Sequence, residues 1–586
     1  MTGHPSPVPD IDTAPSIAFI GLGPKGLYAF ERLIAKLHRR SSQKPVTLHI
    51  WEPRARLGVS LPYDLDQPPY LRMNFANRWV SARAPEAPSL PTPPPALVPW
   101  LEQHHPALAD ADDFAPRCVV GEYLHSVFEA ALSDLPEAVR VEHHPEKAVD
   151  LRLAQLQPGR LESGTSPMRS RWQVVGASGG RVEVDQVLIS VGHDARPRPS
   201  LGEDGAGLIP AVFPVDRWLT EEAVPPGSDV AMRGFALTWI DATLALFEGR
   251  GGRFESVDDG PRLRYRPGSG EVRTIFPFSR TGRPLLAKPD GHRVPHRGDL
   301  DEVWEEGRRR IAELELDGES ATAAILRQVA ASAAQALERA EPQQPELSAD
   351  RPQTMIQLVA RRCAEPPPRL APQEVEQEMR HAWEVAVGRR PLDHWWALGQ
   401  AWRGLYPALV DSISHRGLPT AAWPSFWRLS REMERIAFGP PAINVAKILA
   451  LLDAGRIDLS FVQNPTVSFA DGLPCLIHGS RQQTVDRLVH AVLRPPGAEP
   501  GPDSLLGGLL TAGHARQLEG TDGIEITRSA QCIGDDGRPT PGLSVLGRAT
   551  EGCVLGNDTL SRTLHHHPEA WAARVVAWLV NRLAEV

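Results

Sequence analysis

Three glycines near the start of the chain, Gly21, Gly23 and Gly26, have the types and spacing of a phosphate-binding turn. They follow an apolar run at residues 17–20 and precede an amphipathic helical pattern at residues 27–34, so the order is strand, turn and helix. The first glycine permits the turn, the second lets the backbone approach a phosphate, and the third lets helix and strand pack closely. This order predicts a binding site for the pyrophosphate of a dinucleotide.

The residues around this turn strengthen the prediction. Pro24 and Lys25 occupy the start of the expected helix, whose N-terminal amide groups favour an anion. A second apolar run, Val46–Trp51, ends in Glu52, where a carboxylate can accept hydrogen bonds from an adenosine ribose. An ordinary strand–loop–helix with a surface glutamate is the alternative, and the combination favours the dinucleotide site.

A second nucleotide-type signal begins about two hundred residues later. Val230–Met232 predicts a strand, Gly234 a turn, and the sequence from Ala236 onward a helix that contains Thr238 in its first turn. The pattern is G-x-A in place of G-x-G, and Arg233 adds a cation beside the turn. We take Arg233, Gly234 and Thr238 as candidate cofactor contacts.

Two arginines follow the next predicted strand, near residues 274–278. Arg280 and Arg283 lie just beyond the strand end, where a basic residue suits the 2′-phosphate of NADP and so favours NADPH over NADH. The alternative is an α/β repeat with surface arginines.

The long segment after Glu52 is rich in proline, yet it contains tyrosine, phenylalanine and tryptophan. Aromatic residues bury enough area to hold a loop in place, so we expect Arg72–Ser81 to be ordered and close to the cofactor. Arg72, Asn74 and Asn77 are the candidate catalytic residues of this aromatic loop. Polar contacts that only stabilise the fold are the alternative for all three.

The order of strand, turn and helix patterns along the chain predicts an α/β fold with two Rossmann-like dinucleotide-binding units and a largely helical insertion. A chain of 586 residues is too long for one ordinary core. The predicted organisation is a disordered N-terminus (1–15), a first FAD-binding part (16–200), an NAD(P)-binding-like domain (201–298), a helical insertion (299–460) and a return to the first domain (461–586).

Composition excludes several function classes. A net charge of −9 argues against nucleic-acid binding, and no apolar run is long enough to cross a bilayer, so we expect a cytoplasmic protein without membrane contact. The five cysteines are scattered without a CxxC pair, which leaves neither a dithiol redox centre nor a spaced metal site. The run His565–His567 fits a helix-entry loop better than a metal site, because consecutive histidines on a regular element cannot all face one ion. We therefore predict no metal.

Several segments together resemble the FAD/NAD(P)-binding family that pairs two Rossmann units, and within it the bacterial flavin-dependent N-monooxygenases that convert aspartate to nitrosuccinate. The segments are IAFIGLGPKGLYAFERL, VLISVGH, RGFALTWIDA, FSRTGRP and GRATEGCVLGNDTLSR. The resemblance implies that the first glycine turn and Glu52 hold FAD, that Asn74 lies near the flavin, and that Gly192, at the end of the VLISVGH strand, belongs to the same site.

The resemblance also implies that a C-terminal segment folds back over the flavin site. This segment contains Gly547, Asn557, Asp558 and Thr559. Flavoproteins of this type commonly have Gly-Asp here, whereas Gly547 is followed by Arg548, which leaves Asp558 as the alternative carboxylate.

The leading hypothesis is an FAD-dependent, NAD(P)H-driven monooxygenase that N-hydroxylates a small amine or amino acid with molecular oxygen, in specialised biosynthesis. In such chemistry the cofactor performs the difficult step and the protein orients the substrate and excludes water. A flavin-dependent dehydrogenase or oxidase without oxygen insertion, and a non-catalytic nucleotide-binding protein, are the alternatives. Substrate and oligomeric state are not encoded in any of these motifs.

Overall fold

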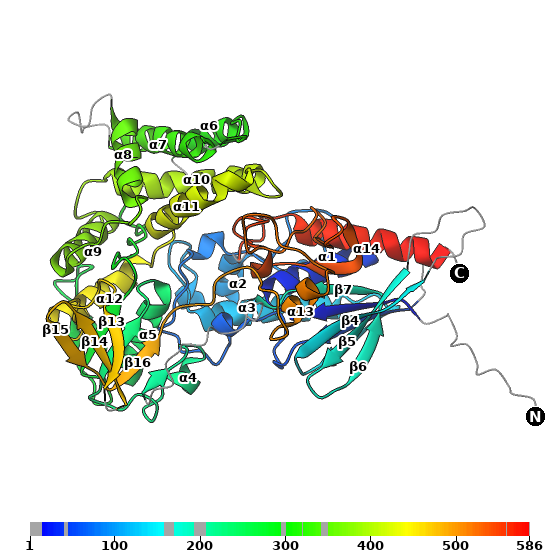
Figure 1. Ribbon diagram of the computed structural model, residues 1–586, viewed down its shortest axis with the longest axis horizontal. Coiled ribbons are helices and arrows are strands. Elements are labelled where there is room, and N and C mark those ends of the chain that lie inside the picture. The colour runs from blue at the N-terminus through cyan, green and yellow to red at the C-terminus, as the bar shows by residue number, and fades with distance from the viewer. Residues whose placement is uncertain are drawn as a thin grey trace, which may run out of the picture.

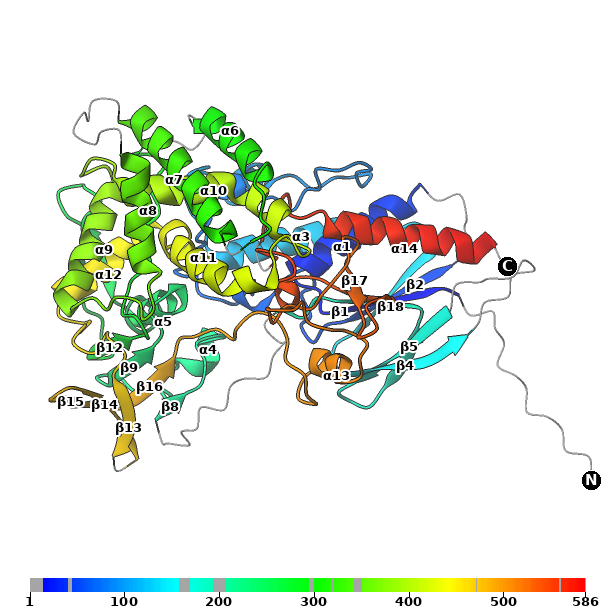
Figure 2. The ribbon, with the colours of Figure 1, turned by 45° about the horizontal axis from the view of Figure 1, so that its top comes forward.

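The computed structural model describes residues 14–39, 45–157, 169–192, 207–294, 300–318, 320–341, 350–470, 472–557 and 560–584. It confirms the α/β fold class: two separate, mainly parallel sheets lie at opposite ends of the molecule, and helices cover and extend them (Figures 1 and 2). The predicted disordered N-terminus falls almost entirely outside the described residues.

The first sheet contains the glycine turn. Its strands are β17 (Gln531–Ile533), β18 (Pro539–Val545), β7 (Gln186–Ile189), β1 (Ser16–Ile20), β2 (Val46–Trp51) and β3 (Val139–His144), in that spatial order. All neighbours are parallel except β17 and β18. Because β1 is central and buried on both faces, it consists of a continuous apolar run, as parallel strands do.

Helices α1 (Pro24–Leu37) and α14 (His567–Ala584) pack against each other and against this sheet (Figure 1). The rings of Phe19 on β1 and Trp571 on α14 meet edge to face at 5.4 Å. The remaining helices of this unit are α2 (Leu97–His104), α3 (Arg117–Ser133) and α13 (Leu505–Thr511). A separate antiparallel meander consists of β4 (Ala148–Gln157), β5 (Arg169–Gly176) and β6 (Arg181–Val184).

The strand at residues 139–144 differs from its sequence assignment. The short apolar runs at residues 139–141, 172–175, 182–184 and 186–191 predict a single β meander, whereas β3 forms the edge of the first sheet, in register with β2. Short apolar runs specify a strand but not its partner, because pairing depends on residues far away in the chain.

The second sheet has the order β12-β9-β16-β8 and is parallel throughout. Its strands are β8 (Leu208–Ile209), β9 (Asp229–Arg233), β12 (Thr274–Phe278) and β16 (Arg487–His490). Helices α4 (Val215–Trp218) and α5 (Leu237–Phe247), the hairpin of β10 (Arg253–Ser256) and β11 (Leu263–Arg266), and the antiparallel β13 (Thr466–Ala470), β14 (Leu473–His478) and β15 (Arg481–Thr484) complete the unit.

The predicted return to the first domain at residue 461 is wrong for its first thirty or so residues. Because β16 pairs with β9, residues up to His490 belong to the second unit, and the helical region is an insertion within that unit. Short strands after a long helical stretch carry no local signal that says which sheet they rejoin.

Seven helices lie between β12 and β13 in the described residues, and most of them form the stack at the upper left of Figure 1. Trp383 on α9 and Val445 on α12 share a core with the second sheet, whereas most of the other helices join the larger core. The seven are α6 (Asp301–Ala312), α7 (Ala321–Ala340), α8 (Arg351–Arg362), α9 (Pro372–Ala386), α10 (His394–Ile413), α11 (Trp423–Ala437) and α12 (Ala442–Asp453). Across the described ranges, no helix has the length and apolar character needed to span a bilayer.

Candidate functional site

The first glycine turn closes tightly over the end of β7. Gly21 has φ +77°, and a side chain there would place its Cβ 2.9 Å from the main-chain oxygen of Ser190. A Cβ at Gly26 would lie 2.6 Å from the Ser190 hydroxyl oxygen. Gly192, with φ +59°, ends this strand two residues later. The close approaches at Gly21 and Gly26 require glycine. The predicted roles of these two residues, in turning the chain and in packing helix against strand, therefore have a steric basis.

The start of α1 has the character of an anion site. Gly23 is the N-cap residue and makes no side-chain cap, Pro24 follows at the first helical position, and the first turn has no acidic residue. The amide groups of this turn therefore have no carboxylate of their own helix to neutralise them. A pyrophosphate fits this end of the helix.

Glu52 lies beside the turn and is buried. Its carboxylate accepts the N–H of Leu22 at 3.3 Å and pairs with Arg54, whose Nη2 lies 3.0 Å from Oε2. The N–H of Arg54 donates to the other oxygen at 3.2 Å. A carboxylate has about four acceptor sites, so capacity remains for a ribose hydroxyl. Turn, helix end and carboxylate thus fit the adenosine diphosphate part of FAD.

The C-terminal segment packs against the same turn. Gly547 has φ +85°, and a Cβ there would lie 3.6 Å from Cγ of Lys25. The Lys25 ammonium lies 3.4 Å from the main-chain oxygen of Ser561. Asn557 is buried and donates to the hydroxyl of Thr550 at 2.6 Å, which holds the segment's own turn. Asp558 and Thr559 lie outside the described residues.

The aromatic loop contains the three candidate catalytic residues in different settings. The guanidinium of Arg72 donates to the main-chain oxygen of Phe114 at 2.9 Å. Asn77 is buried, and its amide donates to the main-chain oxygens of Leu108 and Asp110, at 3.0 and 2.7 Å. These two side chains hold the loop to residues 108–115. Asn74, in contrast, contacts residues outside this part of the chain.

Asn74 lies where the aromatic loop meets the second unit and the helical insertion. Its amide reaches the main-chain oxygen of Phe438 at 3.5 Å, and its main-chain oxygen accepts a hydrogen bond from Lys288. Close by, Arg117 on α3 donates to the main-chain oxygen of Arg72 at 3.0 Å and pairs with Asp241 on α5 at 2.8 Å. The loop therefore links both nucleotide-type units.

Lys288 is a residue that the sequence analysis missed. It is 8% exposed, its Nζ lies 5.0 Å from the ring centre of Phe75, and no ion pair of Lys288 is found among the described residues. Burial, and then the charge of Arg403, lowers its pKa well below the usual lysine value. Nothing local in the sequence marks it, because its environment comes from segments far away in the chain.

The second turn lies at the carboxyl edge of the second sheet. Gly234 has φ +126°, and a Cβ there would lie 2.4 Å from the main-chain oxygen of Ala491, so only glycine fits. Thr238 is buried in the first turn of α5. Arg233 ends β9 and Arg280 follows β12 by two residues; both are exposed, without a side-chain partner in the part of the chain that the structure describes.

His490 is a second missed residue at this edge. It pairs in register with Arg233, is 7% exposed, and its Nε2 is buried without a hydrogen-bond partner among the described residues. Burial and the charge of Arg233 lower its pKa to about 4. Exposed guanidinium groups and an orphaned imidazole nitrogen beside a glycine turn fit a phosphorylated nucleotide.

Arg283 does not join this group, which corrects the sequence prediction for it. It is buried and forms a close ion pair with Glu432 on α11. Burial comes first among the causes that lower its pKa, to about 9. A strand-end position did not reveal this, because the partner lies about 150 residues away.

A cavity of about 330 Å³ lies beside the segment that contains Lys288. Leu286, Ala287 and Pro289, which flank the lysine, line it together with Trp396 and Arg403 on α10. The predicted residues thus fall into two groups, one around the first turn and one at the second sheet edge. Asn74 and Lys288 lie where the units meet, and the cavity is lined by residues of the 286–289 segment and the helical insertion.

Parts of the chain are similar to known proteins. Residues 18–194 match the family described as FAD-NAD(P)-binding. An L-aspartate N-monooxygenase (nitrosuccinate-forming) of Streptomyces davaonensis is 30% identical over 309 residues, which cover 48% of this chain and 46% of that protein. A nitrosuccinic acid synthase of Aspergillus oryzae is 28% identical over 293 residues, covering 48% and 42%. The matches thus span less than half of each curated relative.

The fold is shared with a solved structure. An ornithine hydroxylase of Pseudomonas aeruginosa superposes with a TM-score of 0.50 at 13% identity, covering 97% of this chain and 99% of that chain. This likeness shows the fold alone. The resemblance to the FAD/NAD(P)-binding family and its N-monooxygenases is therefore confirmed, together with the two-unit α/β fold.

Proposed function

We propose that this chain, whose residues 18–194 match the FAD-NAD(P)-binding family, is an FAD-dependent, NADPH-driven monooxygenase that hydroxylates the nitrogen of an amino acid. The observation that carries the proposal is the pair of glycine turns, each at the carboxyl edge of its own parallel sheet, with Glu52 beside the first and Arg233 and Arg280 beside the second. Ligands of open α/β sheets bind at this edge.

Each turn has the donors that its nucleotide needs. At the first, Gly21, Gly23 and Gly26 with the free end of α1 would hold the FAD pyrophosphate, and Glu52 the adenosine ribose. At the second, Arg233 and Arg280 would pair with the 2′-phosphate of NADPH. FAD, when bound, would supply the oxygen chemistry, with NADPH as the reductant.

The protein's own contribution would centre on Asn74 and Lys288. Lys288 is buried without an ion pair among the described residues, and its pKa is held low by burial and Arg403. A bound carboxylate would offset that burial and favour the charged form of the amine. Lys288 would thus hold an anionic amino acid, and the relatives named for aspartate oxidation support this substrate class.

Arg72 and Asn77 would have a supporting role. Their side chains bond to main-chain oxygens of residues 108–114, so they keep the aromatic loop in the conformation that presents Asn74. They would act through the loop and not on the substrate.

The decisive experiment follows NADPH oxidation by the purified, FAD-loaded protein across a panel of amino acids and amines that includes L-aspartate. We expect consumption to be stimulated by an acidic amino acid and the product to have gained oxygen on nitrogen, by mass. Hydrogen peroxide equal to the NADPH consumed, without an oxygenated product, would assign a flavin oxidase instead. A protein that takes up no FAD would contradict the flavin assignment itself.

A further inference from the structure

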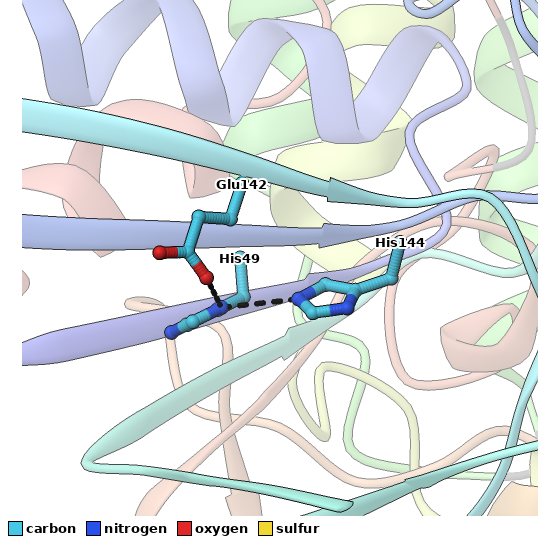
Figure 3. Close-up of side chains that lie close together, drawn as sticks. All are labelled: His49, Glu142 and His144. Atoms are coloured by element: carbon cyan, nitrogen blue, oxygen red, sulfur yellow. Dashed lines mark hydrogen bonds and ion pairs between the residues drawn. The ribbon is translucent and has the colours of Figure 1, made fainter. Parts of the chain in front are cut away.

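A cluster of two histidines and a glutamate lies on the open edge of the first sheet. The register of the parallel strands β2 and β3 places Glu142 beside His49, and His144 beside Trp51. Because alternate residues of a strand share a face, all four side chains project from the same face of the sheet. Figure 3 shows the Glu142 carboxylate and the His144 ring both directed at His49.

The three donor atoms lie close enough together to share one ion. Nδ1 of His49 lies 3.3 Å from Oε2 of Glu142 and 3.1 Å from Nε2 of His144. The three ligand atoms all lie within 4.8 Å of one another. A tetrahedral zinc ion with bonds of about 2.0–2.1 Å sets its ligand atoms about 3.3 Å apart. The two measured distances are close to that edge length.

Neighbouring residues fix the orientation of the two histidine rings, and the Glu142 side of the cluster is accessible to solvent. The His144 ring stacks on the buried indole of Trp51, with ring centres 4.1 Å apart and planes at 9°. His49 is 7% exposed, whereas the Glu142 side chain is 58% exposed. Both imidazoles are therefore oriented by the fold, while the carboxylate can adjust and the side toward solvent stays open for water as a fourth ligand.

We propose that His49, Glu142 and His144 form a binding site for a divalent transition-metal ion, with Zn²⁺ as the ion that suits it. Two imidazole nitrogens and one carboxylate favour zinc and its first-row neighbours over Ca²⁺ or Mg²⁺, which require oxygen ligands. The site is separate from the two glycine turns and does not depend on the proposed oxidation. It would tie the edge strand β3 to β2.

A second cluster of the chain provides the matched comparison. Asp110, Asp112 and His292 also lie within 4.8 Å of one another, but they contain a single imidazole, and Asp110 and His292 are exposed. Asp112 already forms an ion pair with Arg78. With one nitrogen donor this cluster should hold zinc weakly.

The test measures Zn²⁺ binding to the full-length protein by competition with a chromophoric chelator, and records the visible spectrum with Co²⁺ in its place. We expect one tight equivalent per chain with the intense bands of four-coordinate Co²⁺. Glu142→Gln and His144→Gln should each weaken binding at least tenfold. The comparison variant His292→Gln should leave the affinity unchanged.

Folding controls keep the result decisive. Glu142 is exposed, so Glu142→Gln should retain the circular dichroism and unfolding midpoint of the parent protein even if a variant at the buried His49 fails to fold. Parent protein without a tight equivalent would overturn the proposal and leave His49 and His144 as a hydrogen-bonded pair. Equal affinity in Glu142→Gln, His144→Gln and the parent would also overturn it.

Discussion

The side-chain nitrogen of Lys288 donates a hydrogen bond to the main-chain oxygen of Asn74, across 214 residues of sequence. The contact joins the segment after β12 to the aromatic loop of the first unit. It places a buried amine beside the aromatic loop. The junction of the two nucleotide-type units is thus made by residues with little individual sequence signal.

Replacing Lys288 by methionine should separate stability from substrate binding. The pKa of Lys288 lies well below that of an unfolded lysine, so burial of the charged amine opposes folding, and this loss of stability is present at neutral pH. We therefore expect Lys288→Met to keep or raise the unfolding midpoint at pH 7. The KM for an acidic amino acid should rise roughly 10- to 100-fold, the cost of about 1.5–3 kcal/mol for a charged hydrogen bond.

Two controls make that result specific. Lys447 is also buried but pairs with Glu248 at 2.6 Å, so Lys447→Met should lower stability by leaving a carboxylate without its partner. For Lys288→Met, the decarboxylated analogue of the substrate should show an unchanged KM. An equal rise for both compounds would argue against carboxylate binding by Lys288.

Glu52→Gln should weaken FAD binding about tenfold, because a neutral amide replaces a charged acceptor of ribose hydroxyls. The amide keeps the size of the side chain and can still accept the N–H of Leu22. Flavin fluorescence released on dilution measures the affinity. Asp66→Asn, at an exposed ion pair of the same unit, should bind FAD like the parent protein. Undiminished affinity in Glu52→Gln would contradict the ribose assignment.

Arg280→Ala and Arg233→Ala should each raise the KM for NADPH about tenfold and leave the KM for NADH nearly unchanged, since only NADPH has the 2′-phosphate. Arg273 offers a matched control: it is exposed too, but it precedes β12 and so lies at the opposite edge of the sheet, paired with Asp229. Arg273→Ala should affect neither KM. A similar loss with both cofactors would count against a phosphate contact.

Local motifs predicted the parts of the molecule that are built from neighbouring residues. The strand, turn and helix around Gly21 and the carboxylate of Glu52 lie within 40 residues of sequence, and the steric requirements at Gly21 and Gly26 follow from the same segment and β7. The second turn at Gly234 was found for the same reason. The fold class followed from two such units.

What sequence reasoning missed depends on pairing over long distances. The amine of Lys288 meets Asn74, the strand ending in His490 rejoins β9, and Arg283 turns inward to Glu432. None of these has a spacing signature, because each partner lies more than a hundred residues away. An arginine after a strand gives the same sequence pattern whether its side chain faces solvent, as that of Arg280 does, or pairs with a buried carboxylate.

Glu432→Gln should destabilise the protein by about 3–5 kcal/mol, because it leaves buried guanidinium groups without their charge partner. Glu432 is 4% exposed and pairs with Arg283 and with Arg435, whose Nη2 lies 2.8 Å away. Urea unfolding followed by tryptophan fluorescence measures the change. Glu306→Gln breaks only exposed helix-surface pairs with Arg309 and Arg310 and should leave the midpoint where it is. Equal midpoints for both variants would show that the buried cluster contributes nothing.

The contact between His415 and His567 should make stability fall in acid. Their Nε2 atoms lie 2.8 Å apart, and burial, followed by the charge of His415, lowers the pKa of His567 to about 3. In the unfolded chain this imidazole takes up a proton near pH 6.5, whereas the folded protein resists it, so stability is fully present above about pH 6.5 and is lost progressively toward pH 3. His567→Gln should reduce the loss in unfolding free energy between pH 7.5 and pH 5.

His381 serves as a control because its pKa is shifted in the opposite direction to that of His567. The hydrogen bond that its ring donates to the Asp393 carboxylate raises the pKa of His381, so its contribution to stability is present below about pH 6.5 and disappears as the pH rises through the raised value. His381→Gln should therefore steepen the acid loss slightly, while His567→Gln makes it shallower, both measured as urea midpoints at pH 7.5 and pH 5. Parallel profiles for His567→Gln and the parent protein would mean that this buried histidine pair does not control the acid response.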